Sequence, residues 1–85
     1  MQISVRLSGE LARVSGTARL ALDLTDGATV DDARRVLLER LPELSGALAA
    51  TLPLIRGTHV GAGHGLRHGD ELALLLPAAG GEIPR

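Results

Sequence analysis

The chain of 85 residues has no cysteine, no phenylalanine, no tyrosine and no tryptophan, and because all nine of its cationic side chains are arginine it has no lysine. Without cysteine it cannot form disulfides, thiolate metal sites, iron–sulfur ligation or a cysteine nucleophile of its own. Without aromatic rings the core has to be built from leucine, valine, isoleucine and alanine. Without lysine, chains linked through a lysine side chain of this protein cannot form.

Length and charge limit the class of protein further. A chain this short supports one domain, and nine arginines against ten acidic residues provide no basic stripe for nucleic acid. Residues 1–6 lack a charged segment followed by an apolar run, and no uncharged stretch approaches the ~20 residues of a membrane span. We therefore expect a cytoplasmic protein with no nucleic-acid or membrane partner.

Apolar and polar residues alternate over residues 2–7 and again over residues 19–24, which predicts two strands that each bury one face. The intervening segment, with Gly9 and Gly16, is predicted to be a loop. Two neighbouring strands of the same period suggest a hairpin, and Asp26-Gly27 favours a turn after the second strand.

A helix is predicted to begin after Thr29, because threonine is a good N-cap and Asp31 and Asp32 would face the positive end of the helix dipole. Pro42 is expected to end it. The stripe predicted to face a sheet consists of Val30, Ala33, Val36, Leu37 and Leu41. An apolar pattern at Leu44, Leu48 and Leu52 then predicts a short helical turn.

The second half of the chain predicts a third strand over residues 54–57, a loop up to His68 with one short strand near Val60, and a last strand over residues 71–76. Pro77 would stop that strand because it cannot donate a ladder hydrogen bond. The order of the elements predicts an α+β roll in which one helix covers one face of a small mixed sheet. The helix stripe should then pack on Ile3, Val5, Leu72 and Leu74.

The glycine- and histidine-rich run over residues 57–69 resembles a functional loop only superficially. Residues 61–65 lack the following helix and the lysine of a phosphate-binding loop. His59, His64 and His68 lack the spacing of a helix face and a nearby fourth ligand, so we expect solvated histidines and no metal site. No catalytic triad can be assembled from the sequence, and no catalytic residue is predicted.

The end of the chain carries a more specific pattern: Leu66, then Gly69-Asp70-Glu71, an apolar strand, Pro77, and the diglycine Gly80-Gly81. This segment resembles the closing segment of the MoaD/ThiS sulfur carriers. Residues 27–32 are similar to the start of that family's helix, and residues 55–57 lie where the family often has Val-Asn-Gly. The resemblance spans nearly all of residues 1–81.

The resemblance implies a ubiquitin-like β-grasp domain over residues 1–77, with a sheet of about four or five strands, followed by a flexible tail over residues 78–85. A ubiquitin-activating-type adenylyltransferase would use ATP and Mg²⁺ to adenylate Gly81, and a sulfur donor would convert Gly81 to a thiocarboxylate. The tail that presents Gly81 would comprise Pro77, Ala78, Ala79 and Gly80. The chain itself would bind no cofactor and would act as a carrier for a sulfur-acceptor synthase, not as an enzyme.

The sequence departs from the family pattern at one point, because the diglycine is not terminal. The carbonyl of Gly81 forms an amide with Glu82, and an amide offers no carboxylate to ATP. By resemblance, a JAMM-type metalloprotease would cut between Gly81 and Glu82 and remove residues 82–85. If the extension stays in place, the chain would be a β-grasp module that only binds partners non-covalently.

Parity along the last predicted strand indicates a partner surface. Leu72, Leu74 and Leu76 should enter the core, whereas Ala73 and Leu75 should point outward, and Leu54 on the third strand has the same outward parity. Exposed apolar residues beside a functional tail favour docking. The acceptor stays open among a molybdopterin precursor, a thiazole, cysteine and a specialised metabolite, and the small subunit of molybdopterin synthase is the main alternative.

Overall fold

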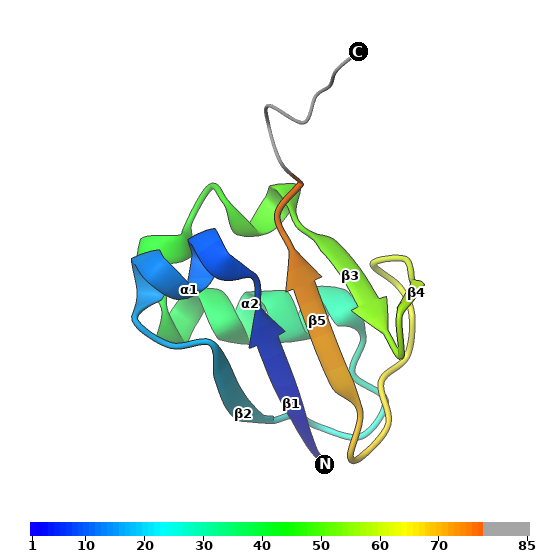
Figure 1. Cartoon of the computed structure of the whole chain (residues 1–85). Helices are drawn as coiled ribbons and strands as arrows, with labels where there is room; N and C mark the ends of the chain where they lie inside the picture. The colour runs from blue at the N-terminus through cyan, green and yellow to red at the C-terminus, as the bar shows by residue number, and fades with distance from the viewer. Residues whose placement is uncertain (78–85) are drawn as a thin grey trace.

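The structure is a computed structural model, and it describes residues 1–77. In this range the chain forms strands, two α-helices and two short 3₁₀ turns (Figure 1). Their bounds are Gln2–Leu7 (β1), Gly9–Ser15 (α1), Arg19–Asp23 (β2), Val30–Arg40 (α2), Pro42–Leu44 (η1), Leu48–Ala50 (η2), Leu52–Ile55 (β3), Thr58–His59 (β4) and Glu71–Leu75 (β5). The predicted α+β class is confirmed.

The strands form one mixed sheet in the order β2-β1-β5-β3-β4. β1 and β5 run parallel in its middle, and the other neighbouring strands pair antiparallel. α2 lies across one face of the sheet, whereas no helix of residues 1–77 covers the opposite face of β1, β5 and β3 (Figure 1). The sheet therefore has one face that packs the core and one face that is free to meet another molecule.

The core lies between the sheet and α2 and is entirely aliphatic. Ile3 and Val5 of β1 and Leu72 and Leu74 of β5 are buried, and so is Leu37 of α2. The helix residues that join this cluster are Val30, Ala33 and Leu37, with Val36 and Leu41 half-buried against it. The helix stripe and the inward residues of β1 and β5 thus form one cluster, as predicted from their periodicities.

α2 begins where its capping residues predict. Thr29 Oγ1 accepts a hydrogen bond from the N–H of Asp32 at 3.2 Å, and the N–H of Thr29 donates to Asp32 Oδ2 at 2.9 Å. This reciprocal capping box satisfies helix donors that would otherwise lack partners. The N–H of Thr29, and after it Arg35, hold the pKa of Asp32 below its usual value. The helix ends at Arg40, and Pro42 starts η1.

The loop predicted between the first two strands was wrong, because most of that segment forms α1. The side chain of Leu11 is buried in the core and anchors the helix. Gly16 ends it with a positive φ of 81°, and its N–H donates to the carbonyl of Ala12 at 2.8 Å, a common helix ending. β1 and β2 pair antiparallel as predicted, but a helix joins them in place of the predicted loop.

The third strand was predicted two residues too late. β3 spans Leu52–Ile55, and Arg56-Gly57 forms the turn into β4. The short strand predicted near Val60 is β4. Leu44 and Leu48 lie in η1 and η2 and are buried, but Leu52 belongs to β3 and is exposed. The shift matters because it adds Leu52 to the outward face of β3.

Leu37→Ala is expected to lower the free energy of unfolding by roughly 2–5 kcal/mol, because it leaves a cavity between α2 and the sheet. Leu38 is the matched control: it is 38% exposed, whereas Leu37 is 0% exposed. Leu38→Ala should lower the free energy of unfolding by less than about 1 kcal/mol. Urea denaturation of both variants measures the difference, and equal losses would contradict the packing of Leu37 on the sheet.

Candidate functional site

The open face of the sheet carries a continuous apolar patch formed by Leu52, Leu54, Ala73 and Leu75. In the register of β3 and β5, Leu52 lies opposite Leu75 and Leu54 lies opposite Ala73. Leu52 and Leu75 are 43% and 38% exposed, and Leu54 and Ala73 are half-buried. The structure therefore brings together the three residues predicted as a partner surface, and the pairing adds Leu52.

A hollow of about 200 Å³ lies at the edge of this patch, where Leu54, Ala73 and Leu75 meet two arginines, Arg6 and Arg56. Glu71 also lines the hollow and pairs with Arg19 at 3.2 Å, whereas Arg6 and Arg56 are in no ion pair among residues 1–77. An apolar floor bordered by charged side chains of both signs suits a partner segment that is apolar with polar groups around it.

Arg56 is held in a conformation that its residue type does not favour. Its φ is 54°, and the φ of Gly57 is 76°, so both central residues of the β3–β4 turn are left-handed. Turns of this kind favour asparagine or aspartate followed by glycine, since asparagine tolerates positive φ and arginine does not. Arg56 also lines the hollow, so the strained residue lies at the candidate site, where such strain is most often found.

The end of β5 leads directly to the predicted tail. Leu76 is half-buried against the core, and Pro77, the last described residue, is exposed. The main-chain N–H of Leu76 donates a hydrogen bond to Ser8 Oγ at 3.1 Å. The other predicted site residues lie outside the described residues, so their roles stay predictions: Ala78, Ala79, Gly80, Gly81 and Glu82.

Sequence reasoning missed Leu52, Arg6, Arg56 and Ser8 as members of the site. Leu52 has the same parity as Leu54, which would have identified it once the start of β3 was known. Arg6 has outward parity on β1, and it lies beside Ala73 only through the parallel register. The bond from Ser8 to Leu76 joins residues 68 positions apart, and no local pattern predicts it.

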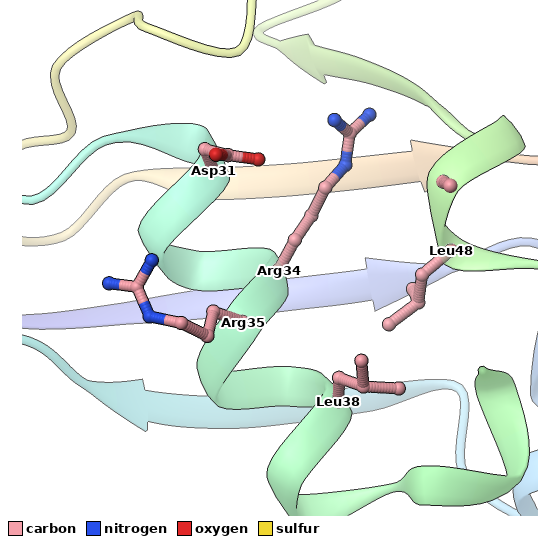
Figure 2. Close-up of a pocket in the computed structure, with 6 residues that line it drawn as sticks. Asp31, Arg34, Arg35, Leu38 and Leu48 are labelled. Carbon is pink, nitrogen blue, oxygen red and sulfur yellow. The ribbon is translucent and has the colours of Figure 1, made fainter. Parts of the chain in front are cut away.

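A second hollow, of about 380 Å³, lies on the other side of the molecule between α2 and η2 (Figure 2). Leu38 and Leu48 point toward one another across it, and Arg34 extends from α2 alongside them. Arg34 Nη2 donates to the carbonyl of Thr51 at 2.8 Å. This bond ties α2 to the segment that leads into β3, so Arg34 has a structural task here.

The glycine-rich run packs against the start of α2. The N–H of Val30 donates to the carbonyl of His64 at 3.0 Å, and the N–H of Asp31 donates to the carbonyl of Ala62 at 2.9 Å. These helix donors are therefore not available to a phosphate group. Within residues 1–77 no group of three or more potential ligands is arranged to hold a metal ion, and His68 Nδ1 accepts a hydrogen bond from the N–H of Gln2 at 3.0 Å.

In the described part of the chain, no helix combines the length and the apolar character needed to cross a membrane.

A mixed sheet with a parallel central pair, one long helix across one face and an open opposite face defines the ubiquitin-like β-grasp class, and solved structures agree. SAMP1 from Haloferax volcanii is 28% identical over 94% of this chain and 99% of its own, with a TM-score of 0.87. The ubiquitin of Caldiarchaeum subterraneum is 21% identical over 94% of this chain and 96% of its own, with a TM-score of 0.61. The β-grasp fold predicted from the resemblance is confirmed.

The family model of the ThiS family matches residues 5–81, so the chain belongs to the ThiS family. A chain in the complex of subunits 1 and 2 of the molybdopterin-converting factor from Helicobacter pylori is 20% identical over 94% of this chain and 99% of its own, with a TM-score of 0.69. A search of the curated proteins finds no match. The resemblance to the MoaD/ThiS carriers is confirmed at the level of the family.

Arg56→Asn is expected to raise the free energy of unfolding by about 1 kcal/mol, because asparagine tolerates the left-handed conformation that strains arginine. Arg67→Asn is the control, since Arg67 is also exposed but has an ordinary φ; it should change stability by no more than about 0.5 kcal/mol. Urea denaturation measures both. A loss of stability in Arg56→Asn would contradict the strain at this turn.

Proposed function

We propose that this chain is a sulfur carrier protein and not an enzyme. After removal of residues 82–85, a carboxylate oxygen of Gly81 attacks the α-phosphate of Mg²⁺-bound ATP on a ubiquitin-activating-type adenylyltransferase, and pyrophosphate leaves. Hydrosulfide supplied by a sulfur donor then attacks the Gly81 carbonyl carbon, the bond from that carbon to the AMP oxygen breaks, and AMP leaves. The resulting thiocarboxylate delivers its sulfur to an acceptor synthase.

The observation that carries the proposal is the position of the diglycine within the family match. The matched region ends at Gly81, and between the end of β5 and Gly81 lie Leu76, Pro77, Ala78, Ala79 and Gly80. Glycine lacks a Cβ, so a chain ending in two glycines can pass through a narrow channel and bring its carboxylate close to ATP. Gly80 and Gly81 are therefore assigned as the working end of the carrier.

Residues 82–85 lie beyond the family match, which supports their assignment as a removable extension. While Gly81 is in amide linkage to Glu82, it has no carboxylate to be adenylated. A JAMM-type metalloprotease that hydrolyses this amide would convert an inactive precursor into a carrier. The extension would then act as a simple block on the reacting carbon.

The apolar patch and the adjacent hollow are proposed as the surface by which the carrier docks on its activating enzyme. Leu75 belongs to the patch and is also the last residue of β5. A partner that binds the patch is therefore placed directly beside the start of the tail. Docking would fix the region that Gly81 can reach, which favours reaction by proximity.

The complex of the two subunits of the Helicobacter pylori molybdopterin-converting factor supports an acceptor synthase as a further partner. A role as the small subunit of a molybdopterin synthase is accordingly the main alternative for the final step. Both roles use the same thiocarboxylate, the same activating enzyme and the same sulfur donor. They differ only in the acceptor that removes the sulfur.

A second candidate function is protein modification, which the similarity to SAMP1, the small archaeal modifier protein 1 of Haloferax volcanii, favours. In that case the activated Gly81 carbonyl is transferred to an amine of another protein instead of to sulfur. Because this chain has no lysine, it could modify other proteins without forming lysine-linked chains of itself. Intact-mass analysis separates the two functions, since a carrier exchanges one oxygen for sulfur and a modifier appears in conjugates.

Leu75→Glu is expected to weaken binding to the cognate activating enzyme by more than about tenfold, which is about 1.4 kcal/mol, because it places a charge in the apolar patch. The fold should be retained because Leu75 faces outward. Leu38→Glu is the matched control, since Leu38 is equally exposed at 38% and lies on the helix side. Calorimetry measures both affinities. Equal weakening by the two variants would show that Leu75 does not lie at the interface.

The proposed role of the extension is tested with the activating enzyme and ATP. The full chain should give no acyl-adenylate, whereas a chain ending at Gly81 should give one, because only the latter has a free carboxylate. Gly81→Ala in the shorter chain should slow the reaction, since a Cβ is added where bare backbone must fit. Pyrophosphate exchange and mass spectrometry for the thiocarboxylate measure the outcome.

Two results would contradict these assignments. Equal activity of the full chain with residues 82–85 still attached would show that the extension does not block Gly81. Inactivity of both chains with the correct activating enzyme would reject the carrier and the modifier alike, and would leave a β-grasp module that binds partners non-covalently.

A further inference from the structure

Ser8 lies where β1 gives way to α1, and it bonds to the end of β5 at two points. Its main-chain N–H donates to the carbonyl of Leu74 at 3.2 Å, and its Oγ accepts from the N–H of Leu76 at 3.1 Å. Leu74 and Leu76 flank Leu75, the last residue of β5. One serine therefore holds the strand on both sides of its final residue.

The hydroxyl of Ser8 takes the place of a main-chain carbonyl. In a parallel ladder, a residue whose N–H donates to one residue of the neighbouring strand accepts at its carbonyl from the residue two positions further on. The carbonyl of Ser8 instead accepts from the N–H of Ala12 at 2.8 Å, in the first turn of α1. The Oγ therefore extends the ladder by one bond beyond the start of the helix.

The Ser8 hydroxyl bonds to Leu76, although a serine at the start of a helix usually caps that helix. Ser8 is the N-cap residue of α1, yet its side chain makes no capping hydrogen bond. A serine at this position usually accepts from an N–H in the first turn. The hydroxyl is directed to β5 and not to its own helix, so its use is at the base of the tail.

The bond to Leu76 is the last main-chain anchor of the described chain. Leu76 is half-buried against the core, and Pro77 has no N–H with which to continue the ladder. The position at which the chain leaves the sheet is therefore set at Leu76. Without this bond, the last hydrogen bond between β5 and the β1 side of the sheet would be the one that the carbonyl of Leu74 accepts from the N–H of Ser8.

Building on the carrier function proposed above, we propose that Ser8 is a positioning residue that fixes the point from which Gly81 reaches the partner's active site. With Leu76 held, residues 77–81 form the arm, whose extended reach is at most about 18 Å. With Leu76 released, residues 76–81 form it, because Leu75 stays paired with Leu52 of β3, and the reach grows to about 22 Å. A longer arm samples a larger volume, which lowers the effective concentration of the Gly81 carboxylate at the reacting centre.

The test compares three variants. Ser8→Thr keeps the hydroxyl, Ser8→Val has the shape of threonine without the hydroxyl, and Ser8→Ala removes the hydroxyl alone. In the full chain, hydrogen exchange at the Leu76 amide should speed up by about tenfold or more in the valine and alanine variants and stay unchanged in the threonine variant. Ser15→Ala is the control, because Ser15 Oγ donates to the carbonyl of Thr17 at the other end of α1 and should not affect Leu76.

Adenylation is then measured on the chain ending at Gly81, which keeps every described residue. Ser8→Val and Ser8→Ala should lower kcat by about 1.3-fold to twofold with KM unchanged, because the docking surface is intact and the arm is longer by one residue. Ser8→Thr should restore kcat. If Ser8→Ala fails to fold, the difference in kcat between Ser8→Thr and Ser8→Val tests the role of the hydroxyl.

Three outcomes would overturn the inference, and they are distinguishable. Unchanged exchange at Leu76 in Ser8→Val would show that the hydroxyl does not anchor the strand. Faster exchange with unchanged kcat would show that the anchor is structural and does not position Gly81. If the unsubstituted chain ending at Gly81 is itself not adenylated, the proposed function fails and the positioning role fails with it.

Discussion

The parallel pairing of β1 with β5 organises the rest of the molecule. It sets Val5 opposite Leu72 and Leu7 opposite Leu74 in the middle of the sheet. Two parallel neighbours cannot be joined by a tight turn, so the chain between them has to cross the sheet, and α2 packs on one face as part of that crossing. The chain consequently leaves the sheet from a central strand, between two neighbours that can each hold its end.

The pairing also decides which residues face a partner. Since the helix covers only one face, alternate residues of β3 and β5 are left on the other, and these are the residues of the apolar patch. β5 thus supplies part of the apolar patch and leads directly to the tail. Under the carrier function proposed above, a partner that binds the patch is placed beside the tail, which favours reaction at Gly81 by proximity.

Local signals predicted the elements whose periodicity and capping agree with the tertiary structure. The alternation in β1 and β5 and the stripe of α2 matched the faces that pack, and Thr29 with Asp32 marked the start of α2. Sequence signals failed at α1, where Gly9 disfavours a helix and a single buried residue, Leu11, anchors it. They failed again at β3, because Pro53 is unfavourable within a strand.

Pro53 is tolerated in β3 because of the short strand beside it. Its carbonyl accepts from the N–H of Val60 at 3.0 Å, and its missing N–H costs one bond toward β4, which is only two residues long. The members of the site that sequence reasoning missed depended in the same way on register. Arg6 joins Ala73, and Ser8 joins Leu76, only because β1 lies parallel to β5.

Two departures from local preference remain, and both border β5. At the end of β1, Ser8 directs its hydroxyl away from the helix that it begins. At the end of β3, Arg56 holds a left-handed conformation that asparagine or glycine would adopt at lower cost. Conflicts between local preference and global structure are expected where a site is built. The Ser8 hydroxyl bonds to Leu76, where the tail leaves the sheet, and Arg56 lines the hollow beside the patch. At the end of each strand that neighbours β5, one residue thus departs from its preferred local conformation or hydrogen bond and contributes to the proposed site.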